Sequence, residues 1–368
     1  MRFVDVNPFF FPYKGGIERR MDDLAKRLAE RGHEVTILTS RLPDTEEEEK
    51  TSGYRIIRLK SRYINVYNPP YVSTSGVLDA LESLDADAVN YNYRWAPSWN
   101  GALKRYSGPK LFTCHNMWGE GIGMAAKLSE MNDRNFLKNI LPSFSHVVCV
   151  SRYVQKATAE RGWPAGKTSF IPCCLSGDPV PNSSPEGDYI LSLGRIVKTK
   201  GLKYMVEAMK DVDSKLIICG KGPETGSLER QISRLGLQDR VEMRGFVEEE
   251  EKNRLMDGCK FFVMPSLFES FGLAAIELMS HRRPIVSTDV NGLPDTVGKG
   301  GITVPPKDPG ALAEAMNRLL SDGNLRESMG ELALEQARSY SYGKFIPKYE
   351  RILEDVAAGN PTEPDFPD

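Results

Sequence analysis

The 368-residue chain contains no apolar run close to the roughly 20 residues that a membrane-spanning helix needs. Its first residues, Met1 to Val6, enter a strand pattern directly, without the charged and apolar segments of a signal peptide. The six cysteines are scattered and form no C-x-x-C pair, so neither a disulfide scaffold nor a zinc cage is expected. These absences predict a cytoplasmic protein whose cysteines stay reduced.

The chain also lacks a strong charge imbalance. Residues 1–182 carry 24 Lys and Arg against 20 Asp and Glu, and the remaining residues carry 24 against 30. Such small differences do not indicate nucleic-acid binding, which needs a concentrated basic face. One cluster of cations in the first half leaves room for an anionic acceptor or for peripheral contact with the inner face of a membrane, although a solvated strand edge is the favoured explanation. The cluster consists of Arg55, Arg58, Lys60 and Arg62.

Length and hydrophobic pattern indicate two α/β domains. A chain of this length suits two cores, and both halves alternate short apolar strands with amphipathic helices, which predicts parallel sheets covered by helices. The break falls in the Pro-, Gly- and Ser-rich segment 176–187, which we interpret as a linker. We therefore expect domains at 1–182 and 183–341, a further helix at 342–357 and a disordered tail at 358–368.

The expected strands are short and mostly apolar. In the first half they are 3–6, 35–38, 54–59, 88–91, 110–114 and 147–150, with a helix at 17–31. In the second half they are 189–193, 216–219, 241–243, 261–264 and 284–287.

The most specific motif joins a buried strand to a helix. The apolar run 260–264 precedes Pro-Ser-Leu-Phe-Glu-Ser-Phe-Gly-Leu-Ala-Ala-Ile-Glu-Leu-Met, which sets Glu269 and Glu277 eight positions apart. Glu269 lies in the turn and Glu277 about two turns inside the helix, so the two carboxylates face different parts of a ligand. That ligand would meet the strand's carboxyl end and the helix's free amides, where Gly272 lets a phosphate approach the backbone. For the pair of glutamates alone, two solvated side chains are the alternative.

Two cations follow the first strand of the second half. Arg195 and Lys200 lie five positions apart in one loop, where a planar guanidinium and a compact ammonium can converge on one diphosphate. Exposed loop cations are usually only solvated, and the intervening Lys198 has no assigned part.

Paired glycines lie where the first helix begins. Gly15 and Gly16 leave backbone amides that can meet a phosphate or a sugar, although a plain tight turn explains them as well. The turn lacks G-x-G-x-x-G, and the second strand is not followed by an acidic residue, so a nicotinamide dinucleotide site is disfavoured. Gly220 and Val247, each in a turn after a later strand, are weaker candidates for a nucleotide pocket.

One histidine and two acidic strings complete the candidates. His115 follows the strand 110–114, so we expect it at that strand's carboxyl end, where a lone histidine is more often packed or solvated. The strings Asp85-Ala86-Asp87 and Asp211-Val212-Asp213 precede strands, which puts them at the opposite sheet edges, and we interpret them as solvated loop acids. No metal and no cofactor is therefore expected, since fixed cations can neutralise a leaving group instead.

Together these motifs resemble those of the glycosyltransferase group 1 family. Its members are retaining nucleotide-sugar transferases with the GT-B fold, α/β, in which two Rossmann-like domains face each other across a cleft. The 265–279 string is similar to the family's E-x7-E motif, and the loop 194–201 to its G-R-x4-K-G motif. The resemblance covers nearly all of residues 1–357, and it implies that the helix 342–357 crosses back to pack on the first domain.

The resemblance implies a role for each candidate. Arg195 and Lys200 would neutralise the leaving diphosphate, His115 and Glu269 would position the sugar, and Glu277 would hold the ribose. The implied catalytic residues are His115, Glu269, Arg195 and Lys200. The implied donor-binding residues are Gly15, Gly16, Arg195, Lys200, Gly220, Val247, Glu269, Ser270, Phe271, Gly272, Leu273, Ala274 and Glu277.

One segment departs from the family pattern. Where many relatives have Asn-Gly after Ile171-Pro172, this chain has Cys173-Cys174, so the geometry of the interdomain turn is expected to differ. We interpret the chain as a metal-independent retaining transferase that moves a hexose-type sugar from a UDP- or GDP-linked donor to a glycan, lipid-linked or small-molecule acceptor. A non-catalytic nucleotide-sugar-binding protein and an NAD(P)-type oxidoreductase are the alternatives, and the sequence leaves base, sugar and acceptor open.

Overall fold

The computed structural model describes residues 1–51, 53–64, 70–119, 123–177, 179 and 185–362. The chain divides into two compact units: unit 1 comprises Met1–Cys173 with Tyr342–Asp368, and unit 2 comprises Cys174–Ser341. The sequence predicts the division at residue 182, whereas the structure divides the chain between Cys173 and Cys174. In the predicted linker, residues 178 and 180–184 lie outside the described part.

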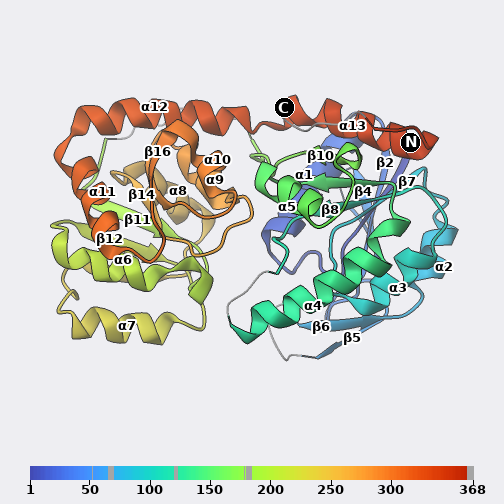
Figure 1. Cartoon of the computed structure of the whole chain (residues 1–368), viewed down its shortest axis with the longest axis horizontal. Coiled ribbons are helices and arrows are strands. Elements are labelled where there is room, and N and C mark those ends of the chain that lie inside the picture. The colour runs from blue at the N-terminus through green and yellow to red at the C-terminus, as the bar shows by residue number, and fades with distance from the viewer. Residues whose placement is uncertain (52, 65–69, 120–122, 178, 180–184, 363–368) are drawn as a thin grey trace. The chain divides into compact units, whose positions relative to one another are not determined.

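Unit 1 contains an eight-stranded sheet with the strand order β10-β9-β8-β7-β1-β2-β4-β3 (Figure 1). Neighbouring strands are parallel except for β3 and β4, which pair antiparallel at one edge. Strands β7, β8 and β9 are buried along their whole length, as expected for a parallel sheet covered on both faces. The sheet strands are β1 (Arg2–Val6), β2 (Glu34–Ser40), β3 (Glu48–Lys50), β4 (Tyr54–Leu59), β7 (Ala88–Tyr91), β8 (Lys110–Cys114), β9 (His146–Cys149) and β10 (Thr168–Phe170). A separate antiparallel pair consists of β5 (Ser61–Ile64) and β6 (Tyr71–Thr74).

The cation cluster of the first half is not a solvated strand edge. Strand β4, which carries two of its members, lies between β2 and β3 in the sheet. Arg58 is buried, and its Nη2 lies 2.7 Å from Oε2 of Glu49 on β3. Lys60 and Arg62, which follow β4, are exposed. The four cations therefore do not form one surface, and the expected membrane contact through them has no support here.

Six α-helices of the described residues belong to unit 1. Helix α1 buries Met21, Leu24 and Leu28 on one apolar stripe, and the chain turns after the helix at Gly32, which has a positive φ. No helix of the described residues is both long and apolar enough to cross a membrane. The helices are α1 (Gly16–Glu30), α2 (Val77–Ser83), α3 (Pro97–Arg105), α4 (Met124–Asn139), α5 (Arg152–Glu160) and α13 (Tyr342–Ala358), with 3-10 turns η1 (Leu141–Ser143) and η2 (Ala165–Lys167).

Helix α13 closes unit 1 from the C-terminal end of the chain. Its buried Tyr349 packs edge-on against Phe3 of β1, with ring centroids 6.2 Å apart. The segment 358–368 was predicted to be a disordered tail. Thr362 within it is buried, however, and its hydroxyl lies 2.5 Å from Nδ1 of His146. The rest of that tail, 363–368, lies outside the described residues.

Unit 2 is a three-layer α/β unit around a parallel six-stranded sheet of order β13-β12-β11-β14-β15-β16 (Figure 1). Side chains alternate between its two faces: Ile190 joins a core with α6, α7 and α11, and the next residue, Leu191, joins a core with α8, α9, α10 and α12. The strands are β11 (Tyr189–Leu193), β12 (Lys215–Cys219), β13 (Val241–Gly245), β14 (Phe262–Met264), β15 (Ile285–Thr288) and β16 (Gly301–Val304). The helices are α6 (Leu202–Ala208), α7 (Thr225–Arg234), α8 (Glu249–Gly258), α9 (Leu273–Met279), α10 (Leu293–Val297), α11 (Pro309–Ser321) and α12 (Gly323–Ser339), with 3-10 turns η3 (Lys198–Lys200), η4 (Met209–Asp211) and η5 (Gly298–Gly300).

Candidate functional site

The candidate site of unit 2 lies where the strand order reverses. From β11 the chain moves outward to β12 and β13 on one side of the sheet and returns to β14 on the other side of β11. The loops that follow β11 and β14 therefore separate at this point, and open α/β sheets bind ligands in such a crevice beyond the carboxyl ends of the strands. The backbone amide of Leu267 donates to the carbonyl oxygen of Thr199 over 2.7 Å, which fixes the two loops to each other.

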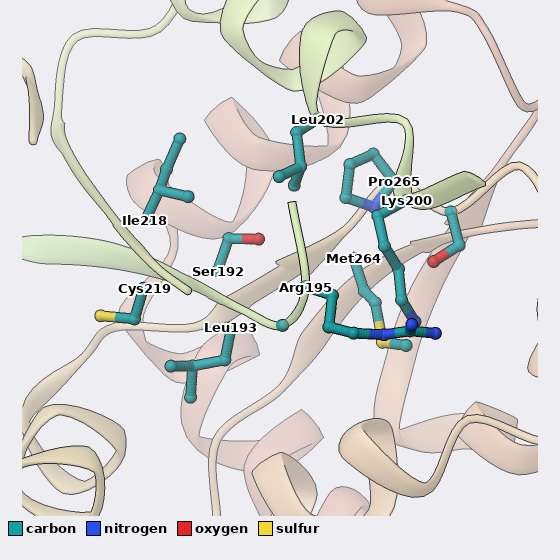
Figure 2. A pocket seen from close by; sticks show the side chains of 11 residues that line it. Ser192, Leu193, Arg195, Lys200, Leu202, Ile218, Cys219, Met264 and Pro265 are labelled. Carbon is teal, nitrogen blue, oxygen red and sulfur yellow. The ribbon is translucent and has the colours of Figure 1, made fainter. Parts of the chain in front are cut away.

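Arg195 and Lys200 line one pocket in this crevice. Figure 2 shows both side chains directed toward the same end of the pocket, beside Met264 at the end of β14 and Pro265 directly after it. The space between the lining residues, open solvent included, is about 260 Å³. Its lining residues are Ser192, Leu193, Gly194, Arg195, Lys200, Leu202, Ile218, Cys219, Met264, Pro265 and Ser266.

The two cations differ in their partners. Lys200 Nζ lies 2.5 Å from Oε2 of Glu269, and both side chains are mostly buried. Arg195 is exposed, and within the described part of the chain its guanidinium makes no hydrogen bond or ion pair. Two residues predicted separately, Lys200 and Glu269, are thus in direct contact, and Arg195 stands beside them with its charge uncompensated.

Gly272 makes the turn between Glu269 and helix α9. Its φ of 97° is one that L side chains rarely adopt, and a Cβ there would come within 2.9 Å of Cδ1 of Leu293. The carbonyl oxygen of Gly272 accepts from the amide of Ala275, whereas the amides of the first turn, at Gly272, Leu273 and Ala274, have no intrahelical acceptor. The backbone amides that were predicted to meet a phosphate therefore lie at the start of α9, directly after the turn that contains Glu269. Ser270 and Phe271 complete this turn.

Glu277 is held by a lysine that the sequence analysis did not identify. Nζ of Lys252 on α8 lies 2.6 Å from Oε1 of Glu277 and 2.8 Å from Oε1 of Glu249. Both members of the Lys252–Glu277 pair are mostly buried, so the pair orients the Glu277 carboxylate.

The weaker candidates of unit 2 lie in neighbouring turns. Gly220 has a φ of 139°, and a Cβ there would come within 1.9 Å of the carbonyl oxygen of Gly194, so this position needs glycine for loop packing. Its amide donates to the carbonyl oxygen of Gly245 over 2.7 Å. Val247 is half-buried and packs against the core that contains α8 and α9.

In unit 1 the paired glycines open helix α1, as expected from the sequence. Gly15 is the N-cap, and Gly16 is the first helical residue. A Cβ at Gly15 would come within 2.4 Å of Oε2 of Glu18, a buried residue whose Oε1 accepts from Asn7 over 3.1 Å. Burial raises the pKa of the Glu18 carboxyl to about 7, against an ordinary value of 4.5.

His115 directly follows β8 and is buried in a polar network. Its Nε2 lies 2.8 Å from Oδ1 of Asn92, whose Nδ2 donates to Oδ1 of Asp5 over 2.6 Å. Because the amide nitrogen of Asn92 donates elsewhere, its oxygen accepts, and Nε2 of His115 carries the proton. Burial lowers the pKa of His115 well below its ordinary value, and the charges of Arg20 and Arg94 lower it further. The imidazole is therefore neutral, with Nδ1 as an acceptor.

Asp5 is the carboxylate that accepts hydrogen bonds in this network. Its Oδ1 accepts from the side-chain amides of Asn90 and Asn92, and the hydroxyl of Thr113 donates to Oδ1 of Asn90. Burial raises the pKa of Asp5 to about 6, although these two amides oppose the shift. Sequence analysis identified only His115 of this network, because the other members lie on or directly after β1, β7 and β8 and meet only in the folded sheet.

The acidic strings lie at the opposite ends of their strands. Asp85 accepts from Nη1 of Arg2 over 2.6 Å, and Asp87 accepts from the backbone amide of Arg2 over the same distance. Both carboxylates thus fix the start of β1, at the edge of the unit 1 sheet opposite the carboxyl ends of its parallel strands. Within the described ranges, no group of three or more His, Cys, Asp or Glu side chains is arranged to hold a metal ion.

Two family models match this chain, one in each half. Residues 178–336 match glycosyl transferases group 1, and residues 14–176 match glycosyltransferase family 4. An uncharacterized glycosyltransferase of Methanocaldococcus jannaschii is 26% identical over 355 residues, which are 95% of this chain and 97% of that protein. A phosphatidyl-myo-inositol mannosyltransferase of Mycobacterium leprae is 25% identical over 370 residues, 97% of each protein.

The chain also resembles solved structures over nearly its whole length. Sucrose-phosphate synthase from Thermosynechococcus elongatus matches with a TM-score of 0.79 at 22% identity, covering 98% of this chain and 100% of that one. This likeness confirms the α/β architecture of two parallel sheets, the GT-B fold, that the sequence predicts.

Proposed function

We propose that this chain, which belongs to the glycosyl transferases group 1 family, transfers a hexose-type sugar from a UDP- or GDP-linked donor. The sugar keeps its anomeric configuration in the transfer. The acceptor is a glycan, a lipid-linked sugar or a small molecule. The observation that carries the proposal is the crevice of unit 2, where the unpartnered Arg195 stands beside the Lys200–Glu269 pair. Two cations that converge on one pocket suit a diphosphate.

In this reaction the bond between the anomeric carbon and the diphosphate oxygen breaks. The acceptor's hydroxyl oxygen bonds to that carbon on the same face, and its proton goes to the departing phosphate oxygen. Negative charge grows on the diphosphate as the bond lengthens, so Arg195 and Lys200 stabilise the transition state more than the bound donor. The first-turn amides of α9 act in the same direction.

The two glutamates act on different parts of the donor. Glu269, held by Lys200, accepts hydrogen bonds from the sugar's hydroxyls. Glu277, held by Lys252, accepts from the ribose hydroxyls, which donate to a carboxylate as charge-assisted hydrogen bonds. In unit 1, neutral His115 offers Nδ1 as an acceptor to a sugar hydroxyl, and the backbone amides at Gly15 and Gly16 suit a phosphate.

The cations of the crevice are tested by Arg195→Ala and Lys200→Ala. Each should lower turnover roughly a hundredfold, because loss of one preorganised charge costs about 3 kcal/mol of transition-state stabilisation. Lys198→Ala is the matched control, since Lys198 is an exposed cation of the same loop that does not line the pocket. Slow hydrolysis of UDP-glucose, UDP-N-acetylglucosamine or GDP-mannose provides the assay without a known acceptor.

Two outcomes would count against the proposal. If both alanine variants hydrolyse the donor as fast as Lys198→Ala, the diphosphate binds elsewhere. If the wild-type protein binds UDP or GDP by calorimetry but hydrolyses no donor and transfers no sugar, it is a non-catalytic nucleotide-sugar-binding protein.

Metal independence is a separate expectation. Because Arg195 and Lys200 supply fixed positive charge, donor hydrolysis should be unchanged after extensive chelation with EDTA. Activity lost in EDTA and restored by manganese would show that a metal ion neutralises the diphosphate.

A further inference from the structure

Asp5 is a carboxylate in an otherwise apolar part of strand β1. It lies between Val4 and Val6, and it is only 1% exposed. Burying an ionised carboxylate costs more free energy than burying an apolar side chain of similar size, so packing alone favours an apolar residue here. Asp5 is the next-to-last residue of β1, and it therefore lies near the carboxyl ends of the parallel strands, where His115 also lies.

The charge of Asp5 is balanced by a buried guanidinium, without a hydrogen bond between the two. Arg20 on α1 is 2% exposed, and none of its three guanidinium nitrogens donates a hydrogen bond to a described residue. Burial raises the pKa of Asp5 to about 6, whereas the amides of Asn90 and Asn92 and the charge of Arg20 oppose the rise. Asp5 is therefore mostly ionised at neutral pH, and an ionised carboxylate can only accept hydrogen bonds.

This carboxylate sets the direction of the hydrogen bonds between it and His115. Oδ1 of Asp5 accepts from Nδ2 of Asn92 over 2.6 Å, which turns Oδ1 of Asn92 toward Nε2 of His115, 2.8 Å away. Asn90 supports the same direction, because its Nδ2 donates both to Asp5 and to Oδ1 of Asn92. If the Asn92 amide were reversed, its oxygen would face the carboxylate, and His115 would have to carry its proton on Nδ1.

One neutral acceptor acts in parallel with Asp5. The carbonyl oxygen of Val6 also accepts from Nδ2 of Asn92, over 3.1 Å. The contact with Asp5 is shorter and charge-assisted, and hydrogen bonds to an ionised acceptor are roughly twice as strong as neutral ones. We therefore expect the carboxylate, and not the carbonyl group, to decide the orientation of Asn92.

We propose that Asp5 is a positioning residue that fixes, through Asn92, the tautomer of His115 whose Nδ1 accepts a hydrogen bond from a hydroxyl group of the ligand. Within the described residues Nδ1 of His115 makes no hydrogen bond, so it is available for this contact. An unprotonated Nδ1 attracts a donor such as a sugar hydroxyl and repels a phosphate oxygen, which only accepts. The proposal rests on the proposed function for the identity of the ligand, whereas the tautomer is a property of unit 1 alone.

Heteronuclear NMR of the histidine rings tests the tautomer without any substrate. The chain contains four histidines, so a spectrum of the full chain with isotope-labelled histidine is simple, and comparison with His115→Gln identifies the His115 signals. In the wild type at neutral pH, Nε2 of His115 should carry the proton and Nδ1 should carry none. A protonated Nδ1, on a neutral or a charged ring, would overturn the proposal.

Substitutions at Asp5 test whether its oxygen decides the tautomer. Asp5→Asn keeps an oxygen acceptor and should keep the proton on Nε2. Asp5→Leu removes the acceptor, and the ratio of the Nε2-protonated to the Nδ1-protonated form should fall about tenfold or more, because a hydrogen bond to a charged group is lost. Asp5→Leu also leaves Arg20 as an unpaired buried charge that can prevent folding, so Asp5→Leu/Arg20→Met, which removes both charges, is the second variant.

Two controls accompany these variants. Thr36→Val changes a buried residue of β2 whose hydroxyl accepts from Arg55 and which lies outside the network, so the His115 signals should not change. His146, a buried histidine on β9, provides a reference in the same spectra, and its signals should stay constant. If Asp5→Leu/Arg20→Met keeps the proton on Nε2 of His115 in full, Asp5 has no positioning role.

Donor hydrolysis measures the consequence for the reaction. Asp5→Leu/Arg20→Met should lower kcat about five- to tenfold, the loss of one hydrogen bond to the sugar, and Asp5→Asn should stay near the wild-type rate. UDP or GDP affinity should be unchanged, because the proposed nucleotide contacts lie in unit 2. A wild type that hydrolyses no donor would count against the proposed function and leave the tautomer result intact. A changed tautomer with an unchanged kcat would overturn the proposed contact between Nδ1 and a hydroxyl group.

Discussion

Lys252 links two helices at the candidate site through one ammonium group. Its contact with Glu249, three positions away on α8, is an intrahelical pair of the kind that a sequence shows. Its contact with Glu277 on α9 spans 25 positions and exists only because α8 and α9 pack on the same face of the unit 2 sheet. If Glu277 binds the ribose, Lys252 is the positioning residue that aims its carboxylate.

Replacing Lys252 tests this positioning role. Lys252→Ala should weaken UDP or GDP binding about three- to tenfold. The reason is that the Glu277 carboxylate loses the charge-assisted hydrogen bond from Lys252 that aims it at the ribose. Lys252→Arg should restore most of the affinity, and turnover at saturating donor should change little. Isothermal titration calorimetry with Glu249→Ala as the control measures the effect. If Lys252→Ala, Lys252→Arg and Glu249→Ala all bind the nucleotide with equal affinity, the Lys252–Glu277 pair contributes little free energy, as is usual for surface ion pairs.

Local spacing accounts for the site residues that the sequence identified. Arg195 and Lys200 share one loop, and Glu269 and Glu277 share one strand-to-helix segment, so short-range pattern is enough to select them. Their pairing is different. The Lys200–Glu269 contact joins two loops that lie 69 positions apart in the sequence. It depends on the register in which β11 pairs with β14, and local spacing does not show that register.

The strands predicted best are those buried on both faces. The ranges 88–91, 110–114 and 189–193 coincide with β7, β8 and β11, because short apolar runs bounded by turn residues leave little choice. The range 54–59 also coincides with β4, whose alternate residues are buried. Five strands, β3, β5, β6, β10 and β16, were missed, and two of them show a dependence on their neighbours. Acidic β3 is fully exposed and forms only by pairing with β4, and β16, with a partly exposed pattern, forms by pairing with β15.

The boundary between the units shows what composition cannot report. Composition changes in the Pro- and Gly-rich segment after residue 176, but contacts decide membership of a unit. The amide of Leu175 donates to the carbonyl oxygen of Tyr340 over 3.1 Å, and Leu175 forms a parallel bridge with Ser341. These contacts tie the chain to unit 2 from Cys174 onward, before the linker-like composition begins. The alternation of strands and helices, repeated in both halves, was sufficient to predict the α/β architecture.

Buried titratable groups give the whole molecule opposing dependences on pH. Burial lowers the pKa of His146 from its ordinary value of 6.5 to about 4. The stability that neutral His146 contributes is therefore fully present above pH 6.5 and is lost as the pH falls through about 4. The raised pKa of Glu18, about 7, acts in the opposite sense, because the folded state prefers the protonated carboxyl. Since the two slopes offset each other, a raw pH profile hides both, and a difference between two variants isolates one.

Glu18→Gln should therefore stabilise the protein only at high pH. At about pH 4 the protonated glutamic acid and glutamine are equivalent, and the Asn7 amide donates to either. As the pH rises from 4.5 through about 7, wild-type stability relative to the variant should fall by about 3 kcal/mol, the cost of ionising a buried carboxyl. All four tryptophans lie in unit 1, so tryptophan fluorescence during urea unfolding follows this unit. Glu30→Gln, at an exposed position of the same helix, is the control for removing one carboxylate from α1. A flat difference for Glu18→Gln would mean that water or a cation reaches the Glu18 carboxylate in the folded protein.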